Sequence, residues 1–216
     1  MFLRLTKKSD LTPTIRAYTF SVDEPLNFIP GQFVMLKQPH AEQKFARAFS
    51  IVGTPGTREL TFLMKHFDDG HISGYLASAE RGAMIEASLP LGRFTLNPAD
   101  ETRVFIASGT GIAPIISFLK NGAIAQTLFG VRSEADLFWT EHLPPAPDTH
   151  ITLSQPSPNQ TWTGLIGRVT AHLPALIAEN KNAAWYVCGN PEMVRDVRAL
   201  LLAANCEPAN IHFEVY

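Results

Sequence analysis

Between residues 2 and 96, apolar and polar side chains alternate over short runs separated by turn-forming residues. Alternation with a period of two is typical of strands that bury one face. The pattern predicts strands over residues 2–8, 14–22, 33–38, 45–52, 60–66 and 83–89, and one helix over 71–79, directly after Asp68-Asp69-Gly70. Strands this short and this evenly spaced indicate an antiparallel β-barrel or sandwich.

After Asn97-Pro98 the rhythm changes to strands that alternate with helices. Strands are predicted over 103–107, 126–131, 150–154, 184–188 and 211–215, and helices over 112–120, from 133 onward, over 168–179 and from 191 onward. Ser133 with Asp136 fits a capping box, and Asn190 before Pro191 fits an N-cap. The alternation predicts a parallel, doubly wound α/β sheet. We therefore expect two domains, residues 1–98 and 99–216.

Composition narrows the chemistry that the chain can perform. Its 216 residues are 45% apolar and 18% charged, and the longest apolar run, 112–119, is too short to cross a bilayer. The first eight residues lack the features of a secretory signal, so we expect a cytoplasmic location. Two cysteines, Cys188 and Cys206, are too few for an iron–sulfur cluster, and the seven histidines show no metal-ligand spacing. We expect no metal, and any redox centre must be an organic cofactor.

Charge is unevenly spread along the chain. Residues 1–98 hold 11 Lys and Arg against 9 Asp and Glu, a net charge of +2, while residues 99–216 hold 7 against 11, a net charge of −4. Neither half is basic enough to indicate a nucleic acid as partner. The mildly positive first half suits an acidic protein.

Arg47-Ala48-Phe49-Ser50 places a guanidinium, an aromatic ring and a hydroxyl within four residues of a predicted strand. A guanidinium matches pyrophosphate oxygens, a ring stacks on an isoalloxazine, and a hydroxyl can hydrogen-bond the redox-active edge of that ring. Alternation puts Arg47 and Phe49 on one face, so Ser50 reaches the same ligand only if the strand ends or twists there. The alternative is an ordinary strand with an exposed arginine and an inward phenylalanine.

Three further segments offer groups for nucleotide binding. Gly70-His71-Ile72-Ser73 presents backbone amides at a helix start, either to a phosphate or to a simple N-cap. Gly109-Thr110-Gly111-Ile112-Ala113-Pro114 follows a buried strand and opens a helix, which suits a dinucleotide pyrophosphate, although an ordinary βα turn can also use two glycines. Cys188-Gly189 ends a strand where ligands of open α/β sheets bind, so Cys188 is either a crevice residue or a small buried hydrophobe.

In this order the motifs resemble those of the ferredoxin-NADP reductase superfamily, over about residues 30–216. The resemblance implies an N-terminal FAD-binding β-barrel and a C-terminal nicotinamide-nucleotide-binding α/β domain. Arg47 to Ser50 is similar to the family's Arg-x-Tyr-Ser motif, which implies that Arg47 holds the FAD pyrophosphate, Phe49 stacks on the flavin and Ser50 bonds near flavin N5. Phe49 in place of tyrosine keeps the stacking but loses a hydroxyl contact. Gly70, Ile72 and Ser73 match the family's second phosphate-binding turn.

The second half carries the NAD(P) side of this resemblance. Gly109, Thr110, Gly111 and Pro114 match the family's GxGxxP loop, and Cys188 with Gly189 matches its CG motif beside the nicotinamide. Glu214 and Tyr216 fit a terminal Glu-x-Tyr motif, whose tyrosine covers the flavin until the nicotinamide displaces it. The implied reaction is hydride transfer between nicotinamide C4 and flavin N5. We expect Ser50, Cys188 and Glu214 to surround the hydride path, while Tyr216 gates it.

The sequence favours NADH, or mixed use of both donors, over strict use of NADPH. Family members that prefer NADPH tend to place a cation directly after the serine that corresponds to Ser154, where it meets the 2′-phosphate. Here Ser154 is followed by Gln155-Pro156-Ser157-Pro158-Asn159-Gln160, with no cation before Arg168. Arg132, after the preceding strand, is the cation that can rescue NADPH binding.

Electrons must leave the flavin to a separate partner, because the chain has no cysteine cluster for a fused iron–sulfur centre. A small acidic ferredoxin or flavodoxin fits the positive first half. Two other functions stay open. One is an NAD(P)H:flavin reductase that releases reduced flavin, against which the Tyr216 cover argues. The other is a non-catalytic, flavin-bearing subunit of a larger electron-transfer complex.

Overall fold

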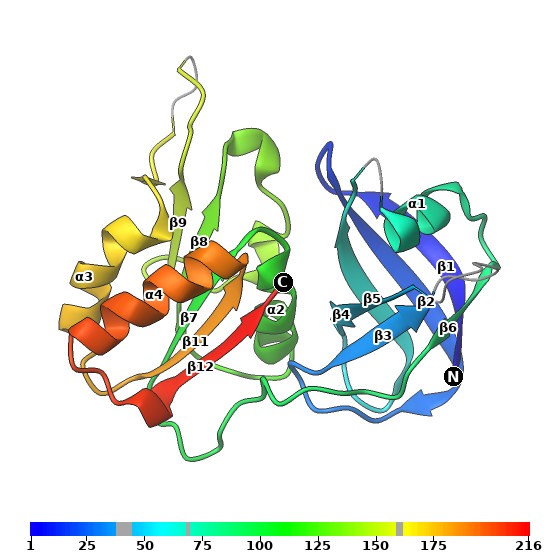
Figure 1. Cartoon of the computed structure of the whole chain (residues 1–216), viewed down its shortest axis with the longest axis horizontal. Helices are drawn as coiled ribbons and strands as arrows, with labels where there is room; N and C mark the ends of the chain where they lie inside the picture. The colour runs from blue at the N-terminus through cyan, green and yellow to red at the C-terminus, as the bar shows by residue number, and fades with distance from the viewer. Residues whose placement is uncertain (38–44, 68–69, 159–161) are drawn as a thin grey trace. The chain divides into compact units, whose positions relative to one another are not determined.

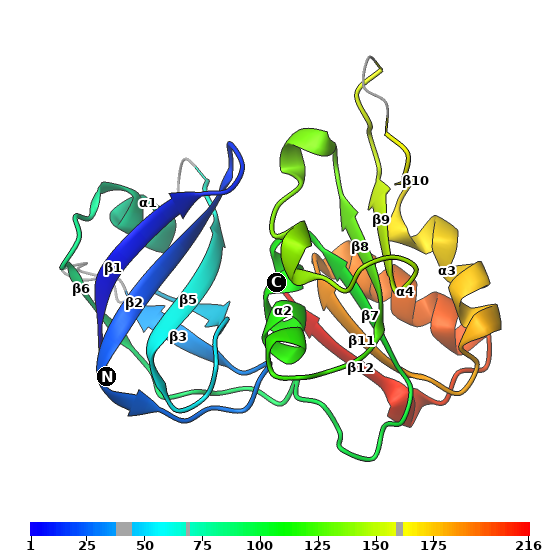
Figure 2. The ribbon, with the colours of Figure 1, turned by 180° about the vertical axis from the view of Figure 1, so that it is seen from behind.

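The structure is a computed structural model that describes residues 1–37, 45–67, 70–158 and 162–216. By its internal contacts the chain divides into two compact units, Met1–Thr95 and Leu96–Tyr216, seen from opposite sides in Figures 1 and 2. The predicted turn residues Asp68 and Asp69, and Asn159 and Gln160 of the segment after Ser154, lie outside the described residues. Across the described ranges, no helix has the length and hydropathy needed to span a bilayer.

The first unit is an antiparallel sheet of six strands in the order β4-β3-β6-β1-β2-β5. Its strands are β1 (Phe2–Asp10), β2 (Ile15–Leu26), β3 (Phe33–Lys37), β4 (Ala46–Ser50), β5 (Thr57–Lys65) and β6 (Met84–Ala87). Just beyond β4, Val52 and Thr61 of β5 exchange two backbone hydrogen bonds of 2.9 and 3.1 Å, so the two ends of the strand order meet. The sheet therefore curls onto itself, which confirms the barrel rather than the sandwich, and all six predicted strands are present.

Helix α1 (His71–Ser78) packs on this barrel. Its Ile72 and Leu76 are buried in the same core as Phe20 and Phe62 of the strands. Because burial of apolar surface stabilises this contact, the first turn of α1 has a fixed place beside the barrel.

The second unit is a parallel sheet in the order β10-β9-β8-β7-β11-β12. Its strands are β7 (Arg103–Ser108), β8 (Gln126–Val131), β9 (Thr149–Leu153), β10 (Leu165–Ile166), β11 (Ala184–Gly189) and β12 (Ile211–Val215). The chain moves outward from β7 to β10 and then returns to β11 on the other side of β7. This order confirms the doubly wound sheet and puts its switch point between β7 and β11.

Helices cover both faces of the parallel sheet, as Figures 1 and 2 show. Helices α3 (Val169–Glu179) and α4 (Pro191–Ala203) bury Trp185 and Val187 of β11 on one face. On the other face, Phe118 of α2 (Ile112–Lys120) contacts the rings of Phe105 and Tyr186. Asn190 caps α4 as predicted, because its side chain accepts a 2.8 Å hydrogen bond from the amide of Met193.

One predicted element is wrong and another was missed. The helix expected from Ser133 onward is a single 3-10 turn, Glu134–Asp136, followed by a second, Thr140–His142. The predicted capping box of Ser133 and Asp136 is present, but Leu137 is extended and Trp139 has a φ of 52°, which no helix can continue through. The missed strand, β10, has two residues and exists through its pairing with β9.

Candidate active site

Strand β4 carries Arg47, Phe49 and Ser50 at one end of the strand order of the barrel sheet. Residues that face each other across an antiparallel pair share a face. Arg47 pairs with Leu36 and Phe49 with Val34, so Arg47 and Phe49 lie on one face, as the alternation predicts. Arg47 is exposed at this position, whereas Phe49 packs partly buried against the barrel core.

Ser50 is the last residue of β4 and is only 1% exposed. It pairs with Phe33 of β3, and within two residues the chain changes its partner strand, because Val52 bonds to Thr61 of β5. The strand thus ends at Ser50, and the contact of Ser50 with a ligand shared by Arg47 and Phe49 stays a prediction.

The start of α1 offers backbone donors to an anion. Among the described residues, no side chain caps this helix, so the first amides, His71, Ile72 and Ser73, keep their capacity to donate. The hydroxyl of Ser73 folds back over Gly70, in the space that a Cβ at residue 70 would fill. Glycine is therefore the residue that fits at this N-cap.

An aromatic stack brings the starts of β4 and α1 together. The rings of Phe45 and His71 lie 3.7 Å apart between centroids, with an interplanar angle of 10°. Phe45 directly precedes β4 and His71 opens α1. Arg47 and the donors of α1 are consequently neighbours within the first unit, which is the arrangement that a pyrophosphate needs.

In the second unit, Gly109–Gly111 forms a 3-10 turn between β7 and α2. Gly109 has a φ of +54°, a left-handed conformation that glycine adopts readily. Gly111 has an ordinary φ of −61°, but a Cβ there would lie 2.5 Å from both Cys188 O and Gly189 Cα. The start of α2 therefore rests directly on the Cys188–Gly189 peptide. Thr110 lies within this turn, and Pro114 lies in the first turn of α2, where a missing N–H breaks no helical bond.

Cys188 lies in register with Ala107 of β7 on one side and Glu214 of β12 on the other. Its side chain is fully buried. Burial raises the pKa of the Cys188 thiol, and the neighbouring Glu214 carboxylate raises it further. Cys188 is therefore a neutral thiol at neutral pH. It is a small buried side chain beside a carboxylate, and not a reactive nucleophile.

The chain end is tied to the same turn. The amide of Tyr216 donates a 2.9 Å hydrogen bond to the carbonyl of Gly189, which continues the β11–β12 ladder by one residue. The second unit thus brings Gly111, Cys188, Glu214 and Tyr216 together around the Cys188–Gly189 turn. Arg47, Phe49 and Ser50 are brought together in the first unit.

The loops after β8 and β9 hold the remaining predicted residues, Arg132 and Ser154. The amide of Ser154 donates to the carbonyl of Val131 at 3.0 Å, and the amide of Gln155 to the carbonyl of Arg132 at 2.7 Å. These bonds place exposed Arg132 beside Ser154 and Gln155.

Sequence reasoning missed Ser108 as part of this region. The amide and the side-chain nitrogen of Asn190 lie 3.4 and 3.5 Å from Ser108 Oγ, and both are donors to it. These contacts join the ends of β7 and β11 across the switch point. The available signal was a polar residue that ends a buried strand directly before a glycine turn.

Sequence reasoning also missed Tyr186 and its contacts, which lie two residues before Cys188 and stabilise β11 and β12. The hydroxyl of Tyr186 donates to Asp100 Oδ2 at 2.5 Å and accepts from the amide of Asn97 at 2.8 Å. Burial raises the pKa of Tyr186 to about 12, so this hydroxyl stays protonated. The ring of Tyr186 stacks on that of His212, its partner in register, with 4.5 Å between centroids. This contact stabilises the pairing of the two strands that carry Cys188 and Glu214.

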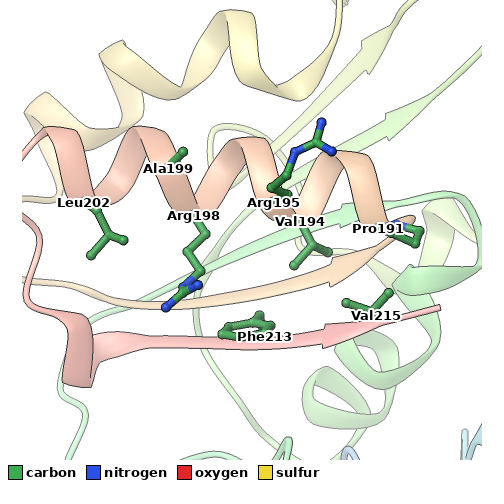
Figure 3. A pocket seen from close by; sticks show the side chains of 8 residues that line it. All are labelled: Pro191, Val194, Arg195, Arg198, Ala199, Leu202, Phe213 and Val215. Atoms are coloured by element: carbon green, nitrogen blue, oxygen red, sulfur yellow. The ribbon is translucent and has the colours of Figure 1, made fainter.

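A pocket between α4 and β12 contains none of the predicted site residues. Apolar side chains from both elements line it, and the guanidinium of Arg198 reaches from α4 to 5.2 Å from the ring centroid of Phe213 (Figure 3). Arg195 points away from the strand. Cys188, Glu214 and the glycine turn are absent from its lining, so this pocket is separate from the candidate active site.

The residues present fit two nucleotides. An exposed guanidinium beside an uncapped helix start, with Gly70 where a side chain would clash, suits the pyrophosphate of FAD. A left-handed Gly109 and the tightly packed Gly111 at the start of α2 suit the pyrophosphate of NAD(P). Within the described ranges, no three His, Cys, Asp or Glu side chains form a group that could hold a metal.

Comparison with known proteins identifies both halves. Residues 2–96 match the oxidoreductase FAD-binding domain family, and residues 105–199 match the oxidoreductase NAD-binding domain family. Ferredoxin--NADP reductase B of Sorangium cellulosum is 32% identical, over 99% of this chain and 96% of that protein. The toluate 1,2-dioxygenase electron transfer component of Pseudomonas putida is 29% identical over 88% of the chain, which spans 59% of that longer relative.

Solved structures show the same fold over the whole chain. A ferredoxin NADP+ reductase from Neisseria gonorrhoeae with bound FAD and NADP aligns with a TM-score of 0.84 at 20% identity, covering 100% of this chain and 98% of that one. These matches agree with the barrel and the doubly wound sheet. The chain belongs to the ferredoxin-NADP reductase family of FAD-dependent NAD(P)H oxidoreductases.

Proposed function

We propose that the protein oxidises NADH through bound FAD and passes the electrons to a separate, small acidic redox protein. The observation that carries this proposal is the in-register pair of Cys188 and Glu214, with Gly111 packed against the Cys188–Gly189 peptide. This arrangement aligns a neutral thiol, a carboxylate and a phosphate-binding turn at the switch point of the sheet, where α/β folds bind nucleotides.

In the first unit, Arg47 and the amides of Ile72 and Ser73 would hold the FAD pyrophosphate. Phe49 would pack against the flavin ring, and Ser50 would donate its hydroxyl proton toward flavin N5. When bound, FAD supplies the chemistry of accepting a hydride from a nicotinamide and releasing the electrons to a second acceptor. The protein contributes orientation and electrostatics.

In the second unit, the turn Gly109–Gly111 would hold the pyrophosphate of the nicotinamide nucleotide. The thiol of Cys188 is neutral and fully buried beside this turn, so it would help to shape the nicotinamide site without carrying a charge. The Glu214 carboxylate, in register with Cys188, would place a negative charge beside a bound nicotinamide, where it would stabilise positive charge on that ring.

The proposed preference for NADH rests on the loop after β9. Ser154 is followed by Gln155, whose amide is engaged by the carbonyl of Arg132, and no cation follows before Arg168. A 2′-phosphate would therefore depend on Arg132 alone for a charge-assisted bond from these loops.

The proposed acceptor follows from charge and from the relatives. The first half of the chain has a net charge of +2, which favours an acidic partner, and the matched relatives are named as ferredoxin reductases or dioxygenase electron transfer components. These 216 residues hold no cysteine cluster for an iron–sulfur centre, which favours an acceptor outside this sequence.

The visible spectrum of the purified protein tests the donor side of this proposal. We expect a flavin spectrum that bleaches under anaerobic conditions on addition of NADH, and at higher donor concentrations on addition of NADPH. Addition of an oxidised ferredoxin or flavodoxin should then restore the colour. It should do so faster than addition of oxidised free flavin as the acceptor.

Each alternative gives a different result in that experiment. Colour without bleaching by either donor indicates a non-catalytic flavin subunit, and flavin that leaves the protein after reduction indicates a flavin reductase. A hundredfold preference for NADPH overturns the proposed donor.

Removal of Tyr216 tests its role as a gate. We expect the deletion to tighten NAD+ binding about tenfold, which corresponds to ~1.4 kcal/mol, and to slow turnover because the nicotinamide leaves more slowly. Titration calorimetry with NAD+ and steady-state kinetics measure the two effects. Tyr216→Phe keeps the ring and should behave as wild type, whereas an unchanged NAD+ dissociation constant in the deletion excludes the gate.

A further inference from the structure

The pairing of β8 with β9 continues past the ends of both strands. Ser154 bonds to Val131, Gln155 bonds to Arg132, and the amide of Ser157 donates to Glu134 Oε2 at 3.1 Å. These three contacts hold the two following loops side by side. The backbone that bears Arg132 and Glu134 is therefore held in place by hydrogen bonds to the neighbouring loop.

Glu134 is held in a defined place as an anion. The capping box of Ser133 and Asp136 fixes the turn in which it lies, and Ser157 fixes its carboxylate from the other loop. Its own amide and that of Ser157 lower the pKa of Glu134, so it is ionised at neutral pH. The second oxygen, Oε1, has no hydrogen-bond partner among the described residues, and no ion pair there neutralises the carboxylate.

The position of this charge relates it to the nucleotide. The pyrophosphate turn follows β7, and β8 and β9 are the next strands outward in the sheet. A dinucleotide that crosses the carboxyl ends of a parallel sheet places its adenosine ribose at these next strands, where an acidic side chain favours a free 2′-hydroxyl. Glu134 follows the end of β8 and contacts the loop that follows β9.

We propose that Glu134 is a specificity-determining residue that disfavours the 2′-phosphate of NADPH and thereby selects NADH. The inference rests on the proposed function, because it assigns a donor preference to the same site. Arg132, exposed and two residues earlier, has the opposite effect and gives the 2′-phosphate a weak counter-charge. The net preference is the balance of these two side chains.

Dissociation constants for NAD+ and NADP+, measured by titration calorimetry, test the proposal without turnover. Glu134→Gln removes the charge and keeps an oxygen that can accept from Ser157. We expect NADP+ binding to tighten about tenfold relative to NAD+ binding, and the gain to shrink at high salt because charges screen each other there. Arg132→Gln should weaken NADP+ binding and leave NAD+ binding unchanged. Glu141→Gln, another acidic residue of the segment between β8 and β9, is the matched control and should change neither constant.

Failure of the inference and failure of the proposed function give different results. If the wild type binds neither nucleotide, the proposed function is wrong. If the wild type binds NAD+ and Glu134→Gln changes the ratio of the two constants by less than twofold, Glu134 does not determine specificity. Loss of both nucleotides in Glu134→Gln alone also overturns the inference, because it shows that the residue only braces the loops.

Discussion

Substitution Gly111→Ala is expected to lower the efficiency of flavin reduction by NADH more than about 100-fold. The added Cβ would lie 2.5 Å from Cys188 O and from Gly189 Cα, both backbone atoms that cannot turn aside. The start of α2 must therefore move away from the Cys188–Gly189 turn, and a displacement near 1 Å at a reacting centre costs about 100-fold in rate. Overpacking of this kind also costs about 1–3 kcal/mol of stability. Rapid-mixing measurement of flavin reduction and a thermal unfolding curve separate the two effects.

The cause of this loss is steric, because Gly111 has an ordinary φ of −61° that alanine adopts without strain. Gly74→Ala is the matched control, since nothing lies within 4 Å of a Cβ at that helical position. It should leave flavin reduction unchanged. A Gly111→Ala protein that folds and keeps its efficiency within threefold of wild type would show that the start of α2 does not position the nucleotide.

Substitution Arg47→Gln is expected to weaken FAD binding about 10- to 100-fold. A hydrogen bond to a charged group contributes about 1.5–3 kcal/mol, and the guanidinium is the one cation proposed for the FAD pyrophosphate. Fluorescence of the flavin released on dilution measures the dissociation constant. The binding of NAD+ to the second unit should not change.

Arg58→Gln is the control for this loss of charge. Arg58 lies on β5 of the same barrel, is largely exposed, and pairs with Glu24 at 3.6 Å. The Arg58→Gln variant loses an equal charge from a different strand, where the guanidinium already has a carboxylate partner. If both variants lose FAD to the same extent, general charge rather than a contact of Arg47 holds the cofactor.

The elements of the fold were largely predictable because their signals are local. The alternation of apolar residues in the first half, and of strands with helices in the second, marks surfaces that must be buried, and Asn190 before Pro191 marks a helix start that the structure confirms. The helix predicted from Ser133 failed for a physical reason. A capping box satisfies the first amides of a helix but cannot extend it, and the chain leaves helical geometry at Leu137.

The segments that form the candidate site could be predicted from the sequence, but the contacts between those segments could not. The glycine turn, Cys188 and the chain end were each visible as motifs, but their meeting depends on the parallel register that puts Cys188 beside Glu214. Register between strands far apart in the sequence follows from the packing of the whole sheet. For the same reason, the contact between Glu134 and Ser157 was invisible, because it joins two loops 23 positions apart.

Strand β12 ends the strand order of the second sheet, and its Phe213 and Val215 are about half exposed. An open strand edge with large apolar side chains is a template on which another chain can add a strand, the first step of aggregation. Arg198 lies over the ring of Phe213, so an incoming strand would have to bury or displace a cation. Charged side chains near a strand edge disfavour such pairing, and Arg198 supplies one beside the strand that carries Glu214.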